Sequence, residues 1–236
     1  MAWDEKNQLT AIIIGNQKKP IMFGAKKIAI VNLTQDGRNQ RNLALKQAST
    51  RWVLFLKEEE VLPQSLIKEI KNFTDKADLQ GWTGAQLIVK NLFLEKTLGY
   101  GNWSPQKEVR LGRRVGEWIE KDDQLLWQFP GQKTILSSPI TAKPYDNLKQ
   151  LLTDINLKST NSAKRKYQRF RRTTILGVIF LPLIFFLKTF FLKLGFLDRL
   201  AGFVLAVLEG FRVFLEESKL LLLIQEEKNK KTKVDN

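Results

Sequence analysis

The chain has 236 residues, enough for one α/β domain with a sizeable core and an appendage. It contains no cysteine and no histidine, which excludes disulfides and thiolate metal sites and leaves carboxylates, Lys or Tyr for acid–base chemistry near neutral pH. Its formal net charge of +15 predicts an anionic partner, either nucleic acid or an acidic membrane surface.

The first predicted elements are two short apolar strands. Residues 11–14 form an Ile-rich run that ends at Gly15, which is typical of a buried strand followed by a turn. A second apolar run at 28–31 is closed by Asp36 and Gly37, which are strong turn residues. Two strands are therefore expected before the first helix.

The central predicted element is a strand at 52–56, preceded by a short amphipathic helix at 43–48. Its five residues are apolar on both faces, which is typical of a parallel strand covered by helices on both sides. Four charged residues follow at once: Lys57, Glu58, Glu59 and Glu60. Ligand crevices of open α/β sheets lie at the carboxyl ends of the strands, so these groups are placed to meet a ligand or a metal. A solvated turn is the alternative.

Further along, Pro63 suits the first turn of a helix through about Phe73, and residues 81–89 are expected to return as a strand. Trp103 offers an aromatic face to a sugar ring, and Arg110 offers a planar fork to a carboxylate or phosphate. A core Trp and a surface Arg explain the same two residues. An amphipathic helix from Leu148 to Asn156 is expected to close the domain.

The C-terminal part alternates between strongly basic and strongly apolar sequence. Residues 158–172 carry seven cationic side chains and no acidic one, and apolar residues dominate after them. The longest uncharged run, 173–187, has about 15 residues, fewer than the roughly 20 that span a bilayer, and Pro182 interrupts it. An interfacial helix pair or embedded hairpin on anionic headgroups is expected. A spanning helix through Leu197, with its lysines snorkelling, stays open.

The position of the basic run also distinguishes between the two anionic partners. It adjoins long apolar segments, and no groove-reading module or set of stacking aromatic residues accompanies it. A membrane surface is therefore expected as the partner, and nucleic acid is not.

Several segments together resemble a family 2 glycosyltransferase of the GT-A fold, in the branch of the lipopolysaccharide-core β-glucosyltransferases. Asn42, with Ala44 and Leu45, matches that branch's Asn-x-Ala-Leu helix, and residues 52–56 match its Trp-Val-Leu-Phe-Leu strand without a gap. Its Asp-Ala-Asp-Glu motif is matched in part, with Lys57 in its first position, Glu59 in its third and Glu60 retained.

Later segments match the same family in the same order. Trp103 and Arg110 fit its Gly-Gly-Trp-x-Pro-Asp and Arg-Leu region, which receives the acceptor, and residues 195–198 fit its Gly-Phe-Leu-Asp segment. The family's histidines are absent, and Asp122 and Asp123 are the nearest positions to its His-Glu pair. An exposed hairpin tip is the alternative for these two aspartates.

The resemblance implies a reduced GT-A-like, Rossmann-like mixed sheet flanked by helices, a nucleotide-sugar donor, and a divalent cation, Mg²⁺ or Mn²⁺. Glu59, with Glu60, would hold the cation, and Lys57 would pair with a donor phosphate. Asp123, with Asp122 beside it, would be the general base. The acceptor and substrate side would be shaped by Trp103, Arg110 and Asn42.

The expected organisation is a GT-A-like domain over 1–157, a basic linker over 158–172, membrane-associated helices over 173–224 and a polar tail over 225–236. The family's first nucleotide-binding strand is expected to be missing. The expected function is transfer of a hexose to a cell-envelope or lipid-linked glycan at the cytoplasmic face of the plasma membrane.

Two other functions remain open from the sequence. A catalytically degenerate relative would bind a glycan, a lipid or a partner enzyme, and it is suggested by Lys57 in place of an acid and by the missing histidines. A purely structural membrane adaptor would bind neither nucleotide nor sugar.

Overall fold

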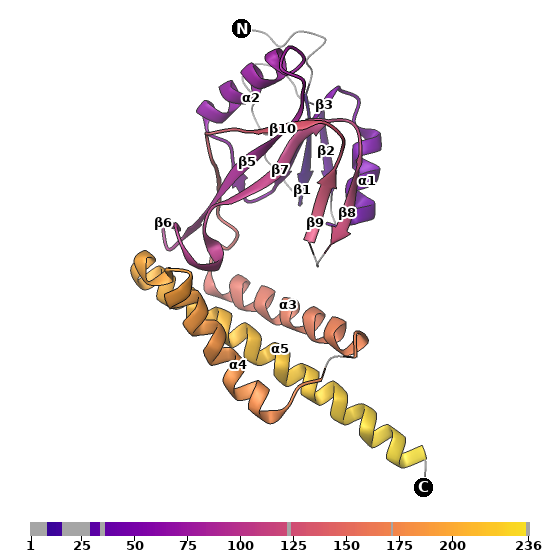
Figure 1. The fold of residues 1–236 in the computed structure, drawn as a ribbon, viewed down its shortest axis with the longest axis vertical. Coiled ribbons are helices and arrows are strands. Elements are labelled where there is room, and N and C mark those ends of the chain that lie inside the picture. Colours follow the sequence, from indigo (N-terminus) through magenta and orange to yellow (C-terminus); the bar gives the residue numbers. More distant parts are fainter. Residues whose placement is uncertain (1–8, 16–28, 34–35, 122–123, 171, 235–236) are drawn as a thin grey trace. The chain divides into compact units, whose positions relative to one another are not determined.

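The computed structural model describes residues 9–15, 29–33, 36–121, 124–170 and 172–234. The chain divides into two compact units (Figure 1). The sheet unit comprises residues 1–91 and 105–144, and the helical unit comprises residues 92–104 and 145–236. The longest strand, β5 (Trp82–Phe93), begins in the sheet unit and ends in the helical unit.

The sheet unit is a mixed sheet flanked by helices, so the predicted mixed α/β class is confirmed. Its strand order is β2-β1-β3-β7-β5-β11-β4, with β10 beside β5, and β8 and β9 form a separate hairpin. The elements other than β5 are β1 (Leu9–Ile14), β2 (Ala29–Leu33), α1 (Arg38–Gln47), β3 (Trp52–Lys57), β4 (Glu60–Val61), α2 (Gln64–Lys76), β7 (Gln106–Arg113), β8 (Glu117–Lys121), β9 (Gln124–Gln128), β10 (Gln132–Ile135) and β11 (Ile140–Ala142).

The first three strands are parallel, and the chain adds β2 on one side of β1 and β3 on the other. Strand β1 lies between β2 and β3 and is parallel to both, whereas β7 is antiparallel to β3 and to β5. The chain therefore runs from β1 to β2 on one side and returns through α1 to β3 on the other. In open α/β sheets such a reversal leaves a crevice at the carboxyl ends of the two strands that it separates.

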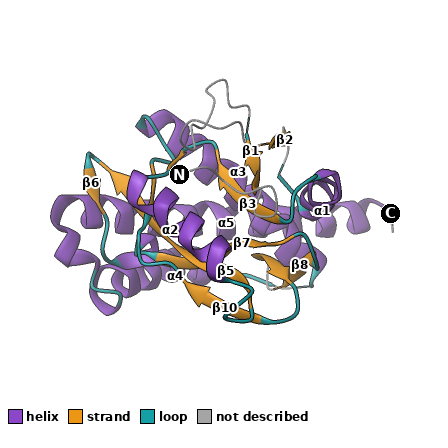
Figure 2. Ribbon diagram, turned by 90° about the horizontal axis from the view of Figure 1, so that it is seen from above, coloured by secondary structure: helices purple, strands orange, loops and turns teal. Residues whose placement is uncertain are grey.

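The first five residues of β3 are apolar because both faces of the strand are covered, as the sequence predicted. Leu54 and Leu56 pack in the cluster that α2 contributes to, and Val53 and Phe55 pack in the cluster that α1 contributes to. The two helices therefore lie on opposite faces of the sheet, with β3 between them (Figure 2).

The β8–β9 hairpin packs its aromatic side chains onto the α1 face. The ring of Phe55 contacts Trp118 and Trp127 edge-on, with ring centroids 4.9 and 5.1 Å apart. Beneath the hairpin, a Cβ at Gly112 would lie 2.9 Å from both Trp127 and Phe129. Glycine here opens the space that the bulky rings fill, which fixes where the hairpin packs.

The helical unit consists of three helices and a polar loop. The helices are α3 (Leu148–Gln168), α4 (Ile175–Leu187) and α5 (Arg199–Val234), and a π-helical turn (Lys188–Leu192) and a 3₁₀ turn (Gly195–Asp198) join α4 to α5. The loop holds β6 (Lys96–Thr97) and the 3₁₀ turn Gly101–Trp103. Residues 158–168, expected as a linker, are the second half of α3, because Lys and Arg are good helix formers and Lys166 pairs with two glutamates of α5.

An ionic network joins α3 to α5. Lys166 Nζ lies 2.6 Å from Glu216 and 2.5 Å from Glu217, and Arg212 Nη1 lies 2.8 Å from Glu216. Lys219 donates hydrogen bonds to Asn156 and other polar groups of α3. The side of α5 that meets α3 therefore carries charged residues beside the buried apolar residues Leu220 and Ile224.

We expect the network's contribution to the stability of the helical unit to be constant at neutral pH and to be lost at acid and at alkaline pH. Burial acts to raise the pKa of Glu216, but Lys166 and Arg212 lower it below 4.5, so its contribution is present above pH 4.5 and is lost as acid protonates it. Burial acts to lower the pKa of Lys166, but its two glutamates raise it above 10.5, so its contribution is lost only above that pH. In Lys166→Met, stability measured by helical circular dichroism should no longer fall at alkaline pH and should fall less at acid pH, because Arg212 still lowers the pKa of Glu216. An unchanged profile would contradict the network's role.

Candidate functional site

The carboxyl ends of β1, β2 and β3 are joined by backbone hydrogen bonds. Gly15 N, after β1, donates to Leu33 O at the end of β2 over 2.8 Å, and Glu58 N, after β3, donates to Ile14 O over 3.0 Å. Gly15 has a φ of 131°, and a Cβ there would lie 2.6 Å from the Cβ of Glu58. The close approach of the β1 and β3 ends therefore depends on glycine.

The acidic segment after β3 turns back into the sheet at Glu60. Its Oε2 accepts a hydrogen bond from Lys57 N at 2.8 Å, and its Oε1 accepts one from Arg110 Nη2 at 3.0 Å. The side chains of Glu60 and Arg110 are only 1% and 2% exposed. Two residues predicted for different parts of the site are thus brought together as a buried ion pair.

A β-bulge directs the side chain of Arg110. The register between β5 and β7 shifts between Val109 and Leu111, so Arg110 has no residue opposite it on β5. Bulges re-aim the side chain of the extra residue and are frequent beside active sites. Here the side chain meets Glu60, and its Nε donates to Glu108 Oε2 at 2.8 Å.

The electrostatics of this pair follow from its burial. Burial raises the pKa of Glu60, although the Arg110 charge and the Lys57 N–H oppose the rise. Burial by itself would lower the pKa of Arg110, but the charges of Glu60 and Glu108 raise it. Arg110 Nη1 is buried and has no hydrogen-bond partner among the described residues. Buried donors are normally paired, so this N–H group could donate to an acceptor of a bound ligand.

The described residues do not supply enough oxygen ligands to hold a cation by themselves. Hard cations take oxygen ligands, and both carboxylate oxygens of Glu60 are already engaged. Glu59 is half-buried, and its backbone oxygen accepts a hydrogen bond from Lys143 N at 3.1 Å. Within the ranges that the structure describes, no three carboxylate side chains converge closely enough to hold a metal. Glu59 is therefore the carboxylate of the predicted pair that remains available for a cation.

Asp36, expected from the sequence only as a turn residue, is a further candidate for the site. It follows β2, and its carboxylate binds Arg41 at 2.6 and 2.8 Å, while the Arg41 guanidinium lies 4.2 Å from the ring centroid of Trp118. Partial burial acts to raise the pKa of Asp36, but Arg41 and then Lys57 lower it below 3.8. The Lys57 charge thus acts on carboxylates after β2 and after β3. Asp36 follows a predicted apolar strand, and this position could have identified it as a site residue from the sequence.

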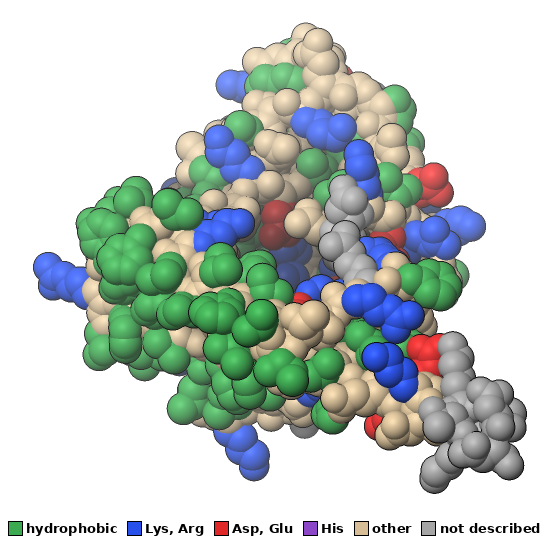
Figure 3. Space-filling model, turned by 60° about the horizontal axis from the view of Figure 1, so that its bottom comes forward, with side chains coloured by type: hydrophobic (Ala, Val, Ile, Leu, Met, Phe, Trp, Pro, Cys, Tyr) green, Lys and Arg blue, Asp and Glu red, His purple; other side chains and the backbone are tan. Residues whose placement is uncertain are grey.

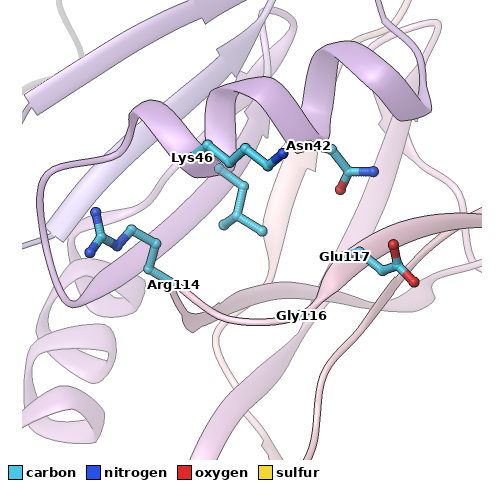
Figure 4. Close-up of a pocket in the computed structure, with 6 residues that line it drawn as sticks. Asn42, Lys46, Arg114, Gly116 and Glu117 are labelled. Atoms are coloured by element: carbon cyan, nitrogen blue, oxygen red, sulfur yellow. The ribbon is translucent and has the colours of Figure 1, made fainter.

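Asn42 lies in a different pocket of the sheet unit. Its Oδ1 accepts a hydrogen bond from Trp118 N at 2.7 Å and its Nδ2 donates to Trp118 O at 3.1 Å, so it holds β8 against α1. The pocket has a volume of about 560 Å³ (Figure 4). It lies near the amino end of β3, because Arg114 in its wall donates its backbone N–H to Arg51 O, and Arg51 directly precedes β3. The lining residues are Asn42, Leu45, Lys46, Arg114, Gly116 and Glu117.

Trp103 belongs to the helical unit. Its ring lies 5.7 Å from that of Tyr145, measured between centroids, beside a pocket of about 290 Å³. Leu151, Ile155, Leu205 and Leu208 contribute apolar side chains to this pocket, and Asp154, Lys158, Glu209 and Arg212 contribute charged ones. An aromatic ring beside charged and apolar groups suits an amphipathic ligand. Asp122 and Asp123 lie outside the described residues.

The chain matches no protein-family model, and no curated protein matches it in sequence.

Proposed function

We propose that the chain is a membrane-associated glycosyltransferase with a reduced GT-A fold, which transfers a hexose from a nucleotide-sugar to a cell-envelope or lipid-linked glycan at the cytoplasmic face of the plasma membrane. The observation that carries the proposal is the strand order: β1 lies between two parallel neighbours, β2 and β3, and charged residues follow both of these neighbours. Nucleotide ligands of open α/β sheets bind at such a point.

The proposed donor site uses residues at this edge. Lys57 supplies a cation for a diphosphate, and Glu59 supplies the carboxylate that remains available for Mg²⁺ or Mn²⁺, with donor phosphates completing the oxygen set. The Glu60–Arg110 pair positions the segment between them, and the buried Nη1 of Arg110 offers a further donor. Asp123, with Asp122, keeps its proposed role as base, and Trp103 its role beside a sugar ring.

A second candidate function is favoured by the state of Glu60. Because both of its carboxylate oxygens are engaged within the fold, one of the two predicted cation ligands is used structurally. A degenerate relative that binds a glycan, a lipid or a partner without catalysis would tolerate this loss. The two functions differ in whether donor binding is followed by transfer.

Titration calorimetry with nucleotide-diphosphate hexoses, with and without Mg²⁺ or Mn²⁺, tests the proposed donor site, and hexose transfer to extracted envelope lipids tests the activity. Glu59→Gln should abolish transfer and leave the fold intact, because the hydrogen bond that ties Glu59 to Lys143 is made by its backbone oxygen. Lys57→Met should weaken donor binding by roughly ten- to hundredfold through the lost charge-assisted bond.

Glu226→Gln, an exposed glutamate of α5, is the matched control and should change neither quantity. Donor binding without transfer supports the degenerate relative, and so does the absence of any donor binding. Full transfer activity in Glu59→Gln would contradict the assignment of this edge as the donor site.

A further inference from the structure

The helical unit exposes a large apolar surface on α4 and α5. Residues 175–192 have a mean hydropathy of 2.5, and only 6% of them are buried, so this segment is not a core helix. Figure 3 shows apolar side chains gathered in a broad field, with Lys and Arg side chains around it. The large exposed apolar residues of α4 and of the adjoining part of α5 are Ile175, Leu176, Ile179, Phe180, Leu183, Ile184, Leu187, Leu200, Phe203, Val207, Phe211 and Phe214.

Helix α5 separates this apolar side from a polar one. Towards α4 it packs tightly, since a Cβ at Gly210 would lie 3.0 Å from Pro182 O, and Phe186 meets Phe203 edge-on. Towards α3 it presents the ion-paired residues of the network, including Arg212 and Glu216. The unit thus has an exposed apolar layer, α4, on one side of α5, and on the other side α3, which meets α5 through both apolar clusters and ion pairs.

The outer surface of α3 is cationic. Its exposed charged side chains are Lys149, Lys158, Lys164, Arg165 and Arg169. The single acidic residue in its sequence, Asp154, lies 2.7 Å from Lys158 and is neutralised by it. Juxtamembrane clusters of Lys and Arg are attracted to anionic headgroups, by about fivefold in binding per residue near the surface. The charge therefore complements an acidic lipid surface beside the apolar layer.

The chain that follows α4 is held by a polar loop of the same unit, and the chain that precedes α4 comes from the basic end of α3. At its C-terminal end, Lys193 O accepts a hydrogen bond from Gly101 N at 2.9 Å, and the buried carboxylate of Asp198 accepts bonds from Gly99 N and Tyr100 N. At its N-terminal end, α4 follows directly on the basic end of α3. A crossing α4 would have to carry the loop 94–103, with its charged Glu95 and Lys96, to the far side of the bilayer.

The way in which the helix ends bears on the same question. The 13 residues of α4 are about 20 Å long, whereas the hydrocarbon core is about 30 Å thick. Beyond Leu187 the helix changes to a π-helical turn and then reverses at Leu194, whose φ is 58°. The whole apolar helix 175–192 has 18 residues and could cross a bilayer by length and composition alone. The reversal at Leu194 and the contacts that hold the C-terminal end of the segment are therefore what favour a segment that turns back.

We propose that the helical unit is a monotopic membrane module: α4 and the apolar side of α5 lie in one leaflet of an anionic bilayer, parallel to its surface, and neither helix crosses. The inference deepens the membrane part of the proposed function and does not depend on sugar transfer. Its occupant is the lipid surface itself, with acyl chains against α4 and acidic headgroups near the cationic residues of α3.

Vesicle flotation of the full chain tests the partner. We expect binding to vesicles of phosphatidylcholine with phosphatidylglycerol, and much weaker binding to phosphatidylcholine alone. Leu183→Glu should abolish flotation, whereas Leu79→Glu, at an 88% exposed leucine of the sheet unit, should leave it unchanged. Arg165→Glu with Arg169→Glu should weaken binding more than twentyfold by the loss of two cations and the gain of two acids.

The absence of cysteine lets single cysteines report the mode of insertion without background labelling. Gln168→Cys lies at the end of α3 and Thr97→Cys lies in the loop that holds the far end of α4, and both positions are exposed. With the protein added to sealed vesicles, a membrane-impermeant maleimide should label both positions at equal rates before and after detergent.

Protection of one of the two positions until detergent is added would mean that α4 crosses, and it would overturn the proposal. Failure of the wild-type chain to float on acidic vesicles, with dimers in solution, would overturn it in favour of a second copy on the apolar side. Circular dichroism of each variant separates these outcomes from misfolding. Flotation and equal labelling without donor binding would leave this inference standing while the proposed transferase activity fails.

Discussion

Replacing Arg110 with methionine is expected to destabilise the sheet unit by about 3–5 kcal/mol, because it leaves the Glu60 carboxylate buried without its partner. The loss should shrink as the pH falls. Burial already raises the pKa of Glu60, and without Arg110 the pKa rises further, so protonation at acid pH removes the uncompensated charge. Urea denaturation at pH 7 and at pH 4 measures both effects.

The matched control is the pair Arg110→Met with Glu60→Gln. Removing both charges should recover much of the lost stability, since buried pairs are often replaced by uncharged residues at little cost. If the double variant is as unstable as Arg110→Met, the loss of stability does not come from an unpaired buried charge on Glu60. Loss of activity in a single variant at either position would reflect the fold as much as the chemistry, so Glu59 is the better functional probe.

Replacing Phe55 with alanine is expected to cost about 3–5 kcal/mol and to release the β8–β9 hairpin from the sheet. Phe55 is fully buried, and its ring contacts those of Trp118 and Trp127. Aromatic pairs of this kind add about 0.5–1.5 kcal/mol beyond area burial. Near-ultraviolet circular dichroism and a denaturant midpoint measure the loss, because both tryptophans lose their fixed surroundings.

Phe170→Ala is the control for the same substitution at an 87% exposed phenylalanine, where the change in stability should stay within about 0.5 kcal/mol. If Phe55→Ala keeps the tryptophan signals and the midpoint of the wild type, the hairpin is held by other contacts. The hairpin carries the sequence positions of Asp122 and Asp123 between its strands, so its attachment also bears on the proposed base.

The sequence by itself determined elements whose cause is local or periodic. The apolar run at 52–56 predicted a strand covered on both faces, and β3 confirms it, because apolar residues on both faces of a strand require two covering layers. Pro63 placed the start of α2 within a residue, since proline suits the beginning of a helix. The apolar composition of residues 173–187 likewise marked α4.

Only the tertiary structure decided which of the predicted site residues meet. Glu60 and Arg110 are 50 positions apart, and they pair because β4 folds back and a bulge in β7 turns the arginine. Asn42 and Trp103 lie in separate pockets, the second of them in the helical unit. The extension of α3 through the basic residues depended on glutamates of α5. Such contacts arise from long-range packing, and patterns of neighbouring residues carry no information on distant partners.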